Sequence, residues 1–194
     1  SDERKDVSKA NVAIFESTYG LTERCFTKKD ADEEARGLIA KIKEVTGRGN
    51  RVLIPTFAFD RAQSIMTFLY DELKDDPQFK TKIIVDSRLL NDINNVCRNI
   101  FQGERLDKWN EVMAWDKFIF VSEFKKTEIF ATDKDNPYVE ISSSGMMSAG
   151  HVLTYAKSIL PNKRDCILFV GYSSPMTIGG KIQQGAKSVT IDGK

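Results

Sequence analysis

The chain has 194 residues, of which 41% are hydrophobic and 29% charged, and its formal net charge is +1. This length holds one well-filled α/β domain or at most two small ones, and the near-neutral charge excludes a protein that holds nucleic acid through bulk positive charge. Three widely spaced cysteines form no CxxC pair, which disfavours a zinc cage and indicates a reducing compartment. No apolar run has membrane-spanning length and no signal peptide is recognisable, so a soluble, cytoplasmic protein without a membrane partner is expected.

Short apolar runs alternate with amphipathic patterns along the chain. After a polar stretch at 1–9, which is expected to be frayed, the apolar runs predict strands at 11–15, 51–55, 82–86, 118–121, 138–142, 165–170 and 188–191. The amphipathic patterns predict helices at 30–47, 60–73, 89–100, 103–116, 122–131 and 148–160, with Asp30 and Asp60 as N-caps of the first two.

This alternation is typical of an α/β protein with a mainly parallel, Rossmann-like sheet and helices on both faces. Right-handed crossovers bring the carboxyl end of every strand to one edge of such a sheet, where ligands bind. Polar residues follow most of the predicted strands. The segments concerned are 16–19, 56–61, 86–87, 122–123, 142–148 and 171–174.

The run Val139–His151 contains the strongest local signal. A predicted strand is followed by serines and a glycine, and then by a helical pattern, an order that suits an anion because the first N–H groups of a helix lack partners. Candidate phosphate-binding residues are Ser143, Ser144, Gly145, Met146 and Ser148. The alternative is that Ser148 only caps the helix and Gly145 only supplies a positive φ.

Other candidates are weaker on local pattern. No GxGxxG follows the first predicted strand and no P-loop is present, which disfavours a dinucleotide or P-loop site. Glu16 is a candidate acid or a candidate hydrogen-bond partner of a histidine. The alternative is a loop carboxylate that accepts hydrogen bonds from backbone N–H groups. Asp60 is a better candidate for a helix N-cap than for a catalytic residue. Arg61 is a candidate either for a phosphate contact or for holding loops together. His151, the one histidine of the sequence, is interpreted as a polar residue of the first helical turn, and no catalytic or metal-binding partner for it is recognisable.

Four of these polar segments, in order, resemble the β-CASP domain of the RNA-processing nucleases of metallo-β-lactamase fold, the family of RNase J and the cleavage and polyadenylation endonuclease. The segments are Glu16–Gly20, Arg51–Gln63, Ser143–Met147 and Phe169–Tyr172.

The resemblance implies that residues 1–194 are a single β-CASP domain, taken from a longer protein whose metallo-β-lactamase domain is absent here. That domain would hold two zinc ions through HxHxDH and further ligands, so no metal or other cofactor is expected in this chain, which alone should be inactive. RNA would run between the two domains. Glu16 would act in catalysis by bonding a histidine of a later motif, whereas the SGMM turn, Arg61 and Tyr172 would face RNA.

The partners implied are RNA, the protein's own metallo-β-lactamase domain and, in the longer protein, a possible homodimer. Two other functions stay open from the residues. One is an independent α/β enzyme that binds a nucleotide or sugar-nucleotide in the same crevice. The other is a binding-only module that recruits RNA or protein.

Overall fold

The computed structural model describes residues 11, 12, 14 and 28–193. The chain forms two compact units, Ser1–Glu34 and Ala35–Lys194, and the second contains the sheet. The predicted strand at 11–15 lies largely outside the described residues, and Glu16 lies wholly outside them.

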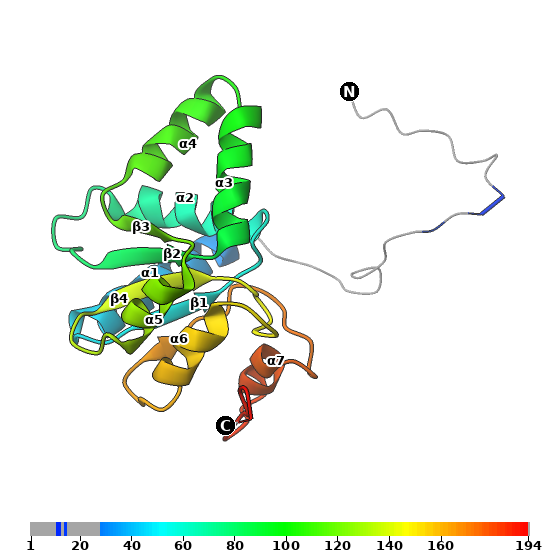
Figure 1. The fold of residues 1–194 in the computed structure, drawn as a ribbon. Coiled ribbons are helices and arrows are strands. Elements are labelled where there is room, and N and C mark those ends of the chain that lie inside the picture. Colours follow the sequence, from blue (N-terminus) through cyan, green and yellow to red (C-terminus); the bar gives the residue numbers. More distant parts are fainter. Residues whose placement is uncertain (1–10, 13, 15–27, 194) are drawn as a thin grey trace. The chain divides into compact units, whose positions relative to one another are not determined.

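Five parallel strands form one sheet in the order β3-β2-β4-β1-β5 (Figure 1). The strands are β1 (Val52–Pro55), β2 (Lys82–Asp86), β3 (Phe118–Val121), β4 (Tyr138–Ser142) and β5 (Cys166–Ile167). The helices are α1 (Lys28–Gly47), α2 (Arg61–Leu73), α3 (Arg88–Ile100), α4 (Glu104–Ala114), α5 (Phe124–Thr132), α6 (Val152–Ile159) and α7 (Ile178–Gln183). The predicted α/β class with a parallel sheet is confirmed.

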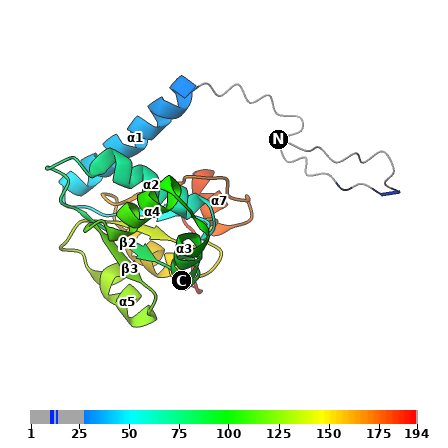
Figure 2. The ribbon, with the colours of Figure 1, turned by 90° about the horizontal axis from the view of Figure 1, so that it is seen from above.

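Helices cover both faces of the sheet because successive strand residues point to opposite sides. Val52 and Ile54 of β1 pack in one buried cluster with α1 to α4, whereas Leu53 packs in a second cluster with α5, α6 and α7. In Figure 1, α2, α3 and α4 lie on one side of the strands and α5 and α6 on the other, and Figure 2 views the same elements from above.

The strand order makes β4 a topological switch point. Its neighbours β1 and β2 are followed by helices of the first face, α2 and α3, whereas β4 is followed by α6 of the second face. The connections after β2 and β4 therefore leave the same carboxyl edge toward opposite faces of the sheet. In parallel α/β sheets this is the place where ligands bind.

The C-terminal region differs from the sequence expectations in three respects. The strand expected at 165–170 is present but shorter: β5 is only Cys166–Ile167, and its ladder with β1 ends at the hydrogen bond from Leu168 N to Leu53 O at 2.8 Å. It lies at the sheet edge with β1 as its one neighbour. The strand expected at 188–191 is irregular, and Ile191 is buried in the cluster of the second face. Helix α7 was not expected. It begins after Thr177, whose Oγ1 accepts a hydrogen bond from Gly180 N at 3.1 Å.

Helix starts and faces also differ in detail. Asp30 lies inside α1 rather than at its cap, and Asp60 occupies the N-cap position of α2 without a side-chain cap bond. In α3 the apolar residues Leu89, Val96 and Ile100 are each more than half exposed, while Leu90 and Cys97 are buried. Among the described residues, no helix is long and apolar enough to cross a lipid bilayer.

Candidate nucleic-acid interface

The loops that follow β1, β2 and β4 are joined at the carboxyl edge. Thr56 N donates to Ser142 O at 2.9 Å, and Ser142 Oγ donates to Asp86 O at 2.6 Å. The hydroxyls of Ser87 and Ser143 lie 2.6 Å apart. The polar segments that follow these strands therefore share one edge, as a parallel sheet requires.

Residues 143–150 form a compact loop, the serine loop, between β4 and α6. Ser144 Oγ accepts hydrogen bonds from Ser148 N at 3.0 Å and from Ala149 N at 3.4 Å, so this hydroxyl holds the loop together. The exposed Ser148 does not cap the helix, because α6 starts at Val152 with His151 in the cap position. The expected order of strand, serine-rich turn and helix is present, but the capping role considered for Ser148 is wrong.

Gly145 is required for a different reason from the one expected. Positive φ angles occur at Met147 (56°) and Gly150 (92°), not at Gly145. A Cβ on Gly145 would lie 3.0 Å from Phe57 N and from Thr56 C, closer than nearly all real contacts. The glycine thus lets the serine loop pack against the backbone that follows β1.

The loop after β5 packs on the serine loop. Ser173 Oγ donates to Gly145 O at 3.5 Å, and Gly179 N donates to Met146 O at 3.0 Å. A Cβ on Gly179 would approach Met146 O to 2.9 Å, so this position also needs a glycine. The contacts bring Tyr172, which is 67% exposed, to the same edge as the serines.

A buried carboxylate and the one histidine of the chain meet at this edge. Asp86, fully buried at the end of β2, lies 2.6 Å from His151 Nδ1 through Oδ1 and accepts a hydrogen bond from Tyr155 OH at 2.7 Å through Oδ2. Thr127 Oγ1 lies 3.1 Å from the same ring nitrogen. Sequence reasoning missed this pair, since 65 residues separate its members and no local spacing marks them.

The pairing fixes the orientation of the imidazole. A carboxylate only accepts hydrogen bonds, so Nδ1 of His151 carries the proton that faces Asp86. The side chain of His151 is 22% exposed, and its Nε2 makes no hydrogen bond in the described part of the chain. This nitrogen is available to accept or donate a hydrogen bond at the surface, and a phosphate oxygen is a suitable partner for its protonated form.

Aromatic and basic side chains surround these groups. Phe57, Phe124 and Tyr172 follow three different strands and are 46%, 53% and 67% exposed. The ring of Phe124 lies 5.7 Å from the His151 ring in an edge-to-face arrangement. Arg61, exposed at the first position of α2, has its backbone N bonded to Phe59 O in the loop after β1. Exposed rings with nearby positive charge are typical of surfaces that bind single-stranded nucleic acid.

Glu140 is an exception to the apolar core below this edge. It lies at the centre of β4, fully buried, and neither carboxyl oxygen has a hydrogen-bond partner among the described residues. Burial, together with the nearby Asp86 carboxylate, raises the pKa of Glu140 well above its usual value. The folded chain therefore favours the neutral acid at this position.

This raised pKa makes stability depend on pH. An unfolded chain releases the Glu140 proton near its usual pKa, whereas the folded chain keeps it, so stability is lost as pH rises above about 4.5. We expect Glu140→Gln to raise the free energy of unfolding at pH 8 by at least about 1 kcal/mol, the equivalent of one pKa unit. The gain should disappear near pH 4. Urea denaturation of the original and variant proteins between pH 4 and pH 8 measures this gain in stability. A difference that does not depend on pH would contradict the raised pKa of Glu140.

The described residues do not form a metal centre. No three His, Cys, Asp or Glu side chains among them lie close enough together to hold an ion. No metal-dependent step is therefore assigned to this part of the chain.

The fold and the edge described above define a parallel α/β domain with a polar edge at its switch point, on which exposed aromatic rings follow several strands. Residues 62–182 match the Beta-Casp domain family, and the chain belongs to that family. The serine loop, Tyr172 and the Asp86–His151 pair all lie within the matched residues, whereas Arg61 immediately precedes them.

Several known proteins are similar over nearly the whole chain. Transcription termination factor FttA of Methanocaldococcus jannaschii is 31% identical over 92% of this chain, and an RNase J-like protein of the same organism is 26% identical over 95%. Integrator complex subunit 11 of Danio rerio is 28% identical over 97%. The chain spans 28%, 42% and 31% of the lengths of these relatives, respectively.

Proposed function

We propose that this chain is the RNA-facing domain of a longer ribonuclease, in which RNA lies between this domain and a metallo-β-lactamase domain. The observation that carries the proposal is the carboxyl edge of β2 and β4, where the serine loop and the Asp86–His151 pair lie, with the exposed Phe124 ring against His151. Two relatives are themselves named as RNases, which supports the choice of RNA over other anions.

The chain's own contribution in this proposal is to hold and orient the strand. Arg61 contributes positive charge to phosphate oxygens, and it has no ion pair among the described residues. The Nε2 atom of His151 adds a hydrogen-bonding group, while its Nδ1 stays bound to Asp86. Phe57, Phe124 and Tyr172 offer rings on which bases stack without regard to sequence. These groups suit an extended single strand better than a small rigid ligand.

Hydrolysis of the phosphodiester belongs to the other domain in this proposal. The β-CASP resemblance implies two zinc ions there, which would activate the attacking water. Glu16, outside the described residues, is proposed to bond a histidine of a later motif of the family. Residues 1–194 as one domain, the zinc ions and a homodimer of the longer protein all stay predictions.

Charge removal at the carboxyl edge of the sheet tests the RNA-binding role. We expect Arg61→Gln to weaken binding of a fluorescein-labelled single-stranded RNA to this chain by about threefold to tenfold, the loss of one phosphate contact. The slope of log affinity against log salt should become shallower by about 0.7. Fluorescence anisotropy at several salt concentrations measures both quantities.

Arg48→Gln is the matched control. Arg48 is also exposed but precedes β1, at the opposite edge of the sheet, and its partner Glu44 is a surface group. The Arg48→Gln variant should leave the RNA affinity and its dependence on salt unchanged. Equal losses in the two variants would indicate diffuse electrostatic attraction and would remove the carboxyl edge from the proposal. Binding of a mononucleotide but not of RNA would instead favour an independent nucleotide-binding enzyme.

A further inference from the structure

Helix α3 carries a row of apolar side chains that is left uncovered in the described part of the chain. Leu89, Val96 and Ile100 are 60%, 52% and 62% exposed, and Ile93, the remaining member of the row, is partly buried. Single exposed apolar residues are ordinary on a protein surface, whereas a contiguous row marks an interaction site. The row shares no residue with the serine loop or with the Asp86–His151 pair.

The spacing of the row specifies a helix as its partner. Its members follow one another at intervals of four, three and four residues, which is the a/d spacing of a coiled-coil seam. The face of α3 that packs on its own domain is a different one, since Leu90 and Cys97 each follow a member of the row by one position and are buried. One position corresponds to a rotation of about 100° around a helix. The row therefore lies beside the packed face and is free to receive a second helix.

A second copy of α3 is complementary to the row when the two helices run antiparallel. In that register Leu89 of one copy faces Ile100 of the other, and Ile93 faces Val96. The two-fold axis repeats both pairings, so the two helices form four layers of aliphatic side chains. No layer brings a charged side chain into the seam.

The polar residues beside the row favour the same orientation. Asp92 and Asn99 occupy the g positions that flank the seam, and both are exposed. In the antiparallel register each Asp92 carboxylate lies opposite an Asn99 amide of the other copy, which supplies a hydrogen-bond donor. In a parallel register Asp92 would instead face Cys97 of the other copy, a buried side chain with only a weak donor. Charge complementarity therefore selects the antiparallel pair.

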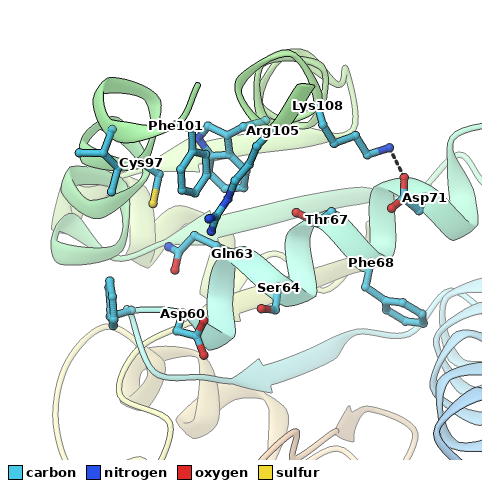
Figure 3. Close-up of a pocket in the computed structure, with 13 residues that line it drawn as sticks. Asp60, Gln63, Ser64, Thr67, Phe68, Asp71, Cys97, Phe101, Arg105 and Lys108 are labelled. Atoms are coloured by element: carbon cyan, nitrogen blue, oxygen red, sulfur yellow. Dashed lines mark hydrogen bonds and ion pairs between the residues drawn. The ribbon is translucent and has the colours of Figure 1, made fainter. Parts of the chain in front are cut away.

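The end of the row adjoins a hollow that can receive the first leucine of the other copy. Ile100, together with Phe59 and Phe101, lines a cavity of about 670 Å³ between α2 and α4 (Figure 3). Phe59 is 71% exposed, so the apolar surface continues beyond the helix. Because Leu89 of the other copy faces Ile100, it lies next to this apolar wall. The cavity thus adds contact area to that of a 13-residue helix, which is only about 20 Å long.

We propose that two copies of this chain associate through an antiparallel pair of α3 helices. An interface built on one short helix buries less than the roughly 800 Å² per partner of a standard stable complex, so the dissociation constant is expected on the order of 10–100 µM. The proposal does not rest on the proposed function, because none of its contacts involves a residue assigned to RNA.

Sedimentation equilibrium of the chain, at concentrations from about 5 to about 500 µM, tests the proposal. We expect a reversible equilibrium between monomer and dimer. Leu89→Asp and Ile100→Lys should each weaken association at least about tenfold, because each places a charge in two of the four apolar layers. Both side chains are more than half exposed, and each new charge suits the dipole at its end of α3, so both variants should fold.

An equimolar mixture of the two variants tests the orientation of the helices. In the antiparallel register the carboxylate introduced at position 89 faces the ammonium introduced at position 100, so the mixture should dimerise more tightly than either variant alone. Parallel helices would bring position 89 against position 89 and would not restore association. Ile129→Lys is the matched control, because Ile129 is an isoleucine of α5 that is 66% exposed and lies outside the row. It should leave association unchanged.

A single monomeric species over the whole concentration range would overturn the proposal and would leave the row to another part of the longer protein. A dimer that persists in Leu89→Asp, or that is lost equally in Ile129→Lys, would also overturn it. So would a mixture that associates no more tightly than its two components. RNA binding, tested with Arg61→Gln, is independent of all these results.

Discussion

Replacing Arg51 with methionine should lower the free energy of unfolding by about 3–5 kcal/mol, the cost of leaving one member of a buried ion pair alone. The side chains of Arg51 and Asp165 are 2% and 1% exposed, and their closest atoms lie 2.6 Å apart. The same guanidinium donates to Ser158 Oγ at 2.8 Å and to Asp133 O at 3.2 Å. It therefore joins the start of β1 to the ends of α5 and α6 and to the start of β5.

Urea denaturation of this chain measures the effect, with Lys41→Met as the control. Lys41 and Glu44 form an ion pair that is nearly half exposed on both sides. Such a pair contributes at most about 1 kcal/mol, so the control should change stability little. A loss of less than about 1 kcal/mol in Arg51→Met would mean that water replaces the guanidinium, and that Asp165 is not stranded.

The second large effect is expected at Asp86. Its replacement by alanine should destabilise the chain by about 2–4 kcal/mol, because two donors lose their acceptor. Tyr155 is fully buried, and its hydroxyl would be left without a partner, while His151 Nδ1 would lose the carboxylate that orients it. The loss is reduced by one opposing contribution, since the Asp86 charge also disfavours ionisation of Glu140.

Tyr155→Phe separates the two parts of this effect. It removes the buried hydroxyl instead of stranding it, so it should cost only about 0.5–1.5 kcal/mol. In the Tyr155→Phe background, Asp86→Ala should cost less than in the original chain, and denaturation of the four proteins gives the coupling. Strictly additive losses would show that the Tyr155–Asp86 bond contributes nothing to stability.

Most of the central sheet could be predicted from the sequence. The bounds of β2, β3 and β4 match the apolar runs because those strands are flanked by sequence that cannot extend them. The edge strand β5 could not be predicted in length, since its extent depends on a single neighbour, β1. The run that ends at Ile191 has strand-like residues, but it packs its isoleucine against helices instead of joining the sheet.

The common edge of the polar segments could be predicted from the sequence, but the contacts within it could not. Strand alternation alone places the serine loop and Tyr172 at one edge, and the structure brings them together. The role of Gly145 depends on the approach of the chain near Phe57, which no local pattern encodes. Likewise, the Asp86–His151 pair exists only because β2 and β4 are neighbours, and adjacency of strands is a property of the whole topology.

The central place of β4 has a consequence for the order in which the chain can assemble. The segments that become β1 and β2 are synthesised early, but they are not neighbours in the sheet, since each pairs with β4. A nascent chain that stops short of Tyr138 lacks the strand that unites them and can build only the β2–β3 pair. Cooperative folding therefore waits for contacts between distant parts of the chain, and slow folding follows from such contacts.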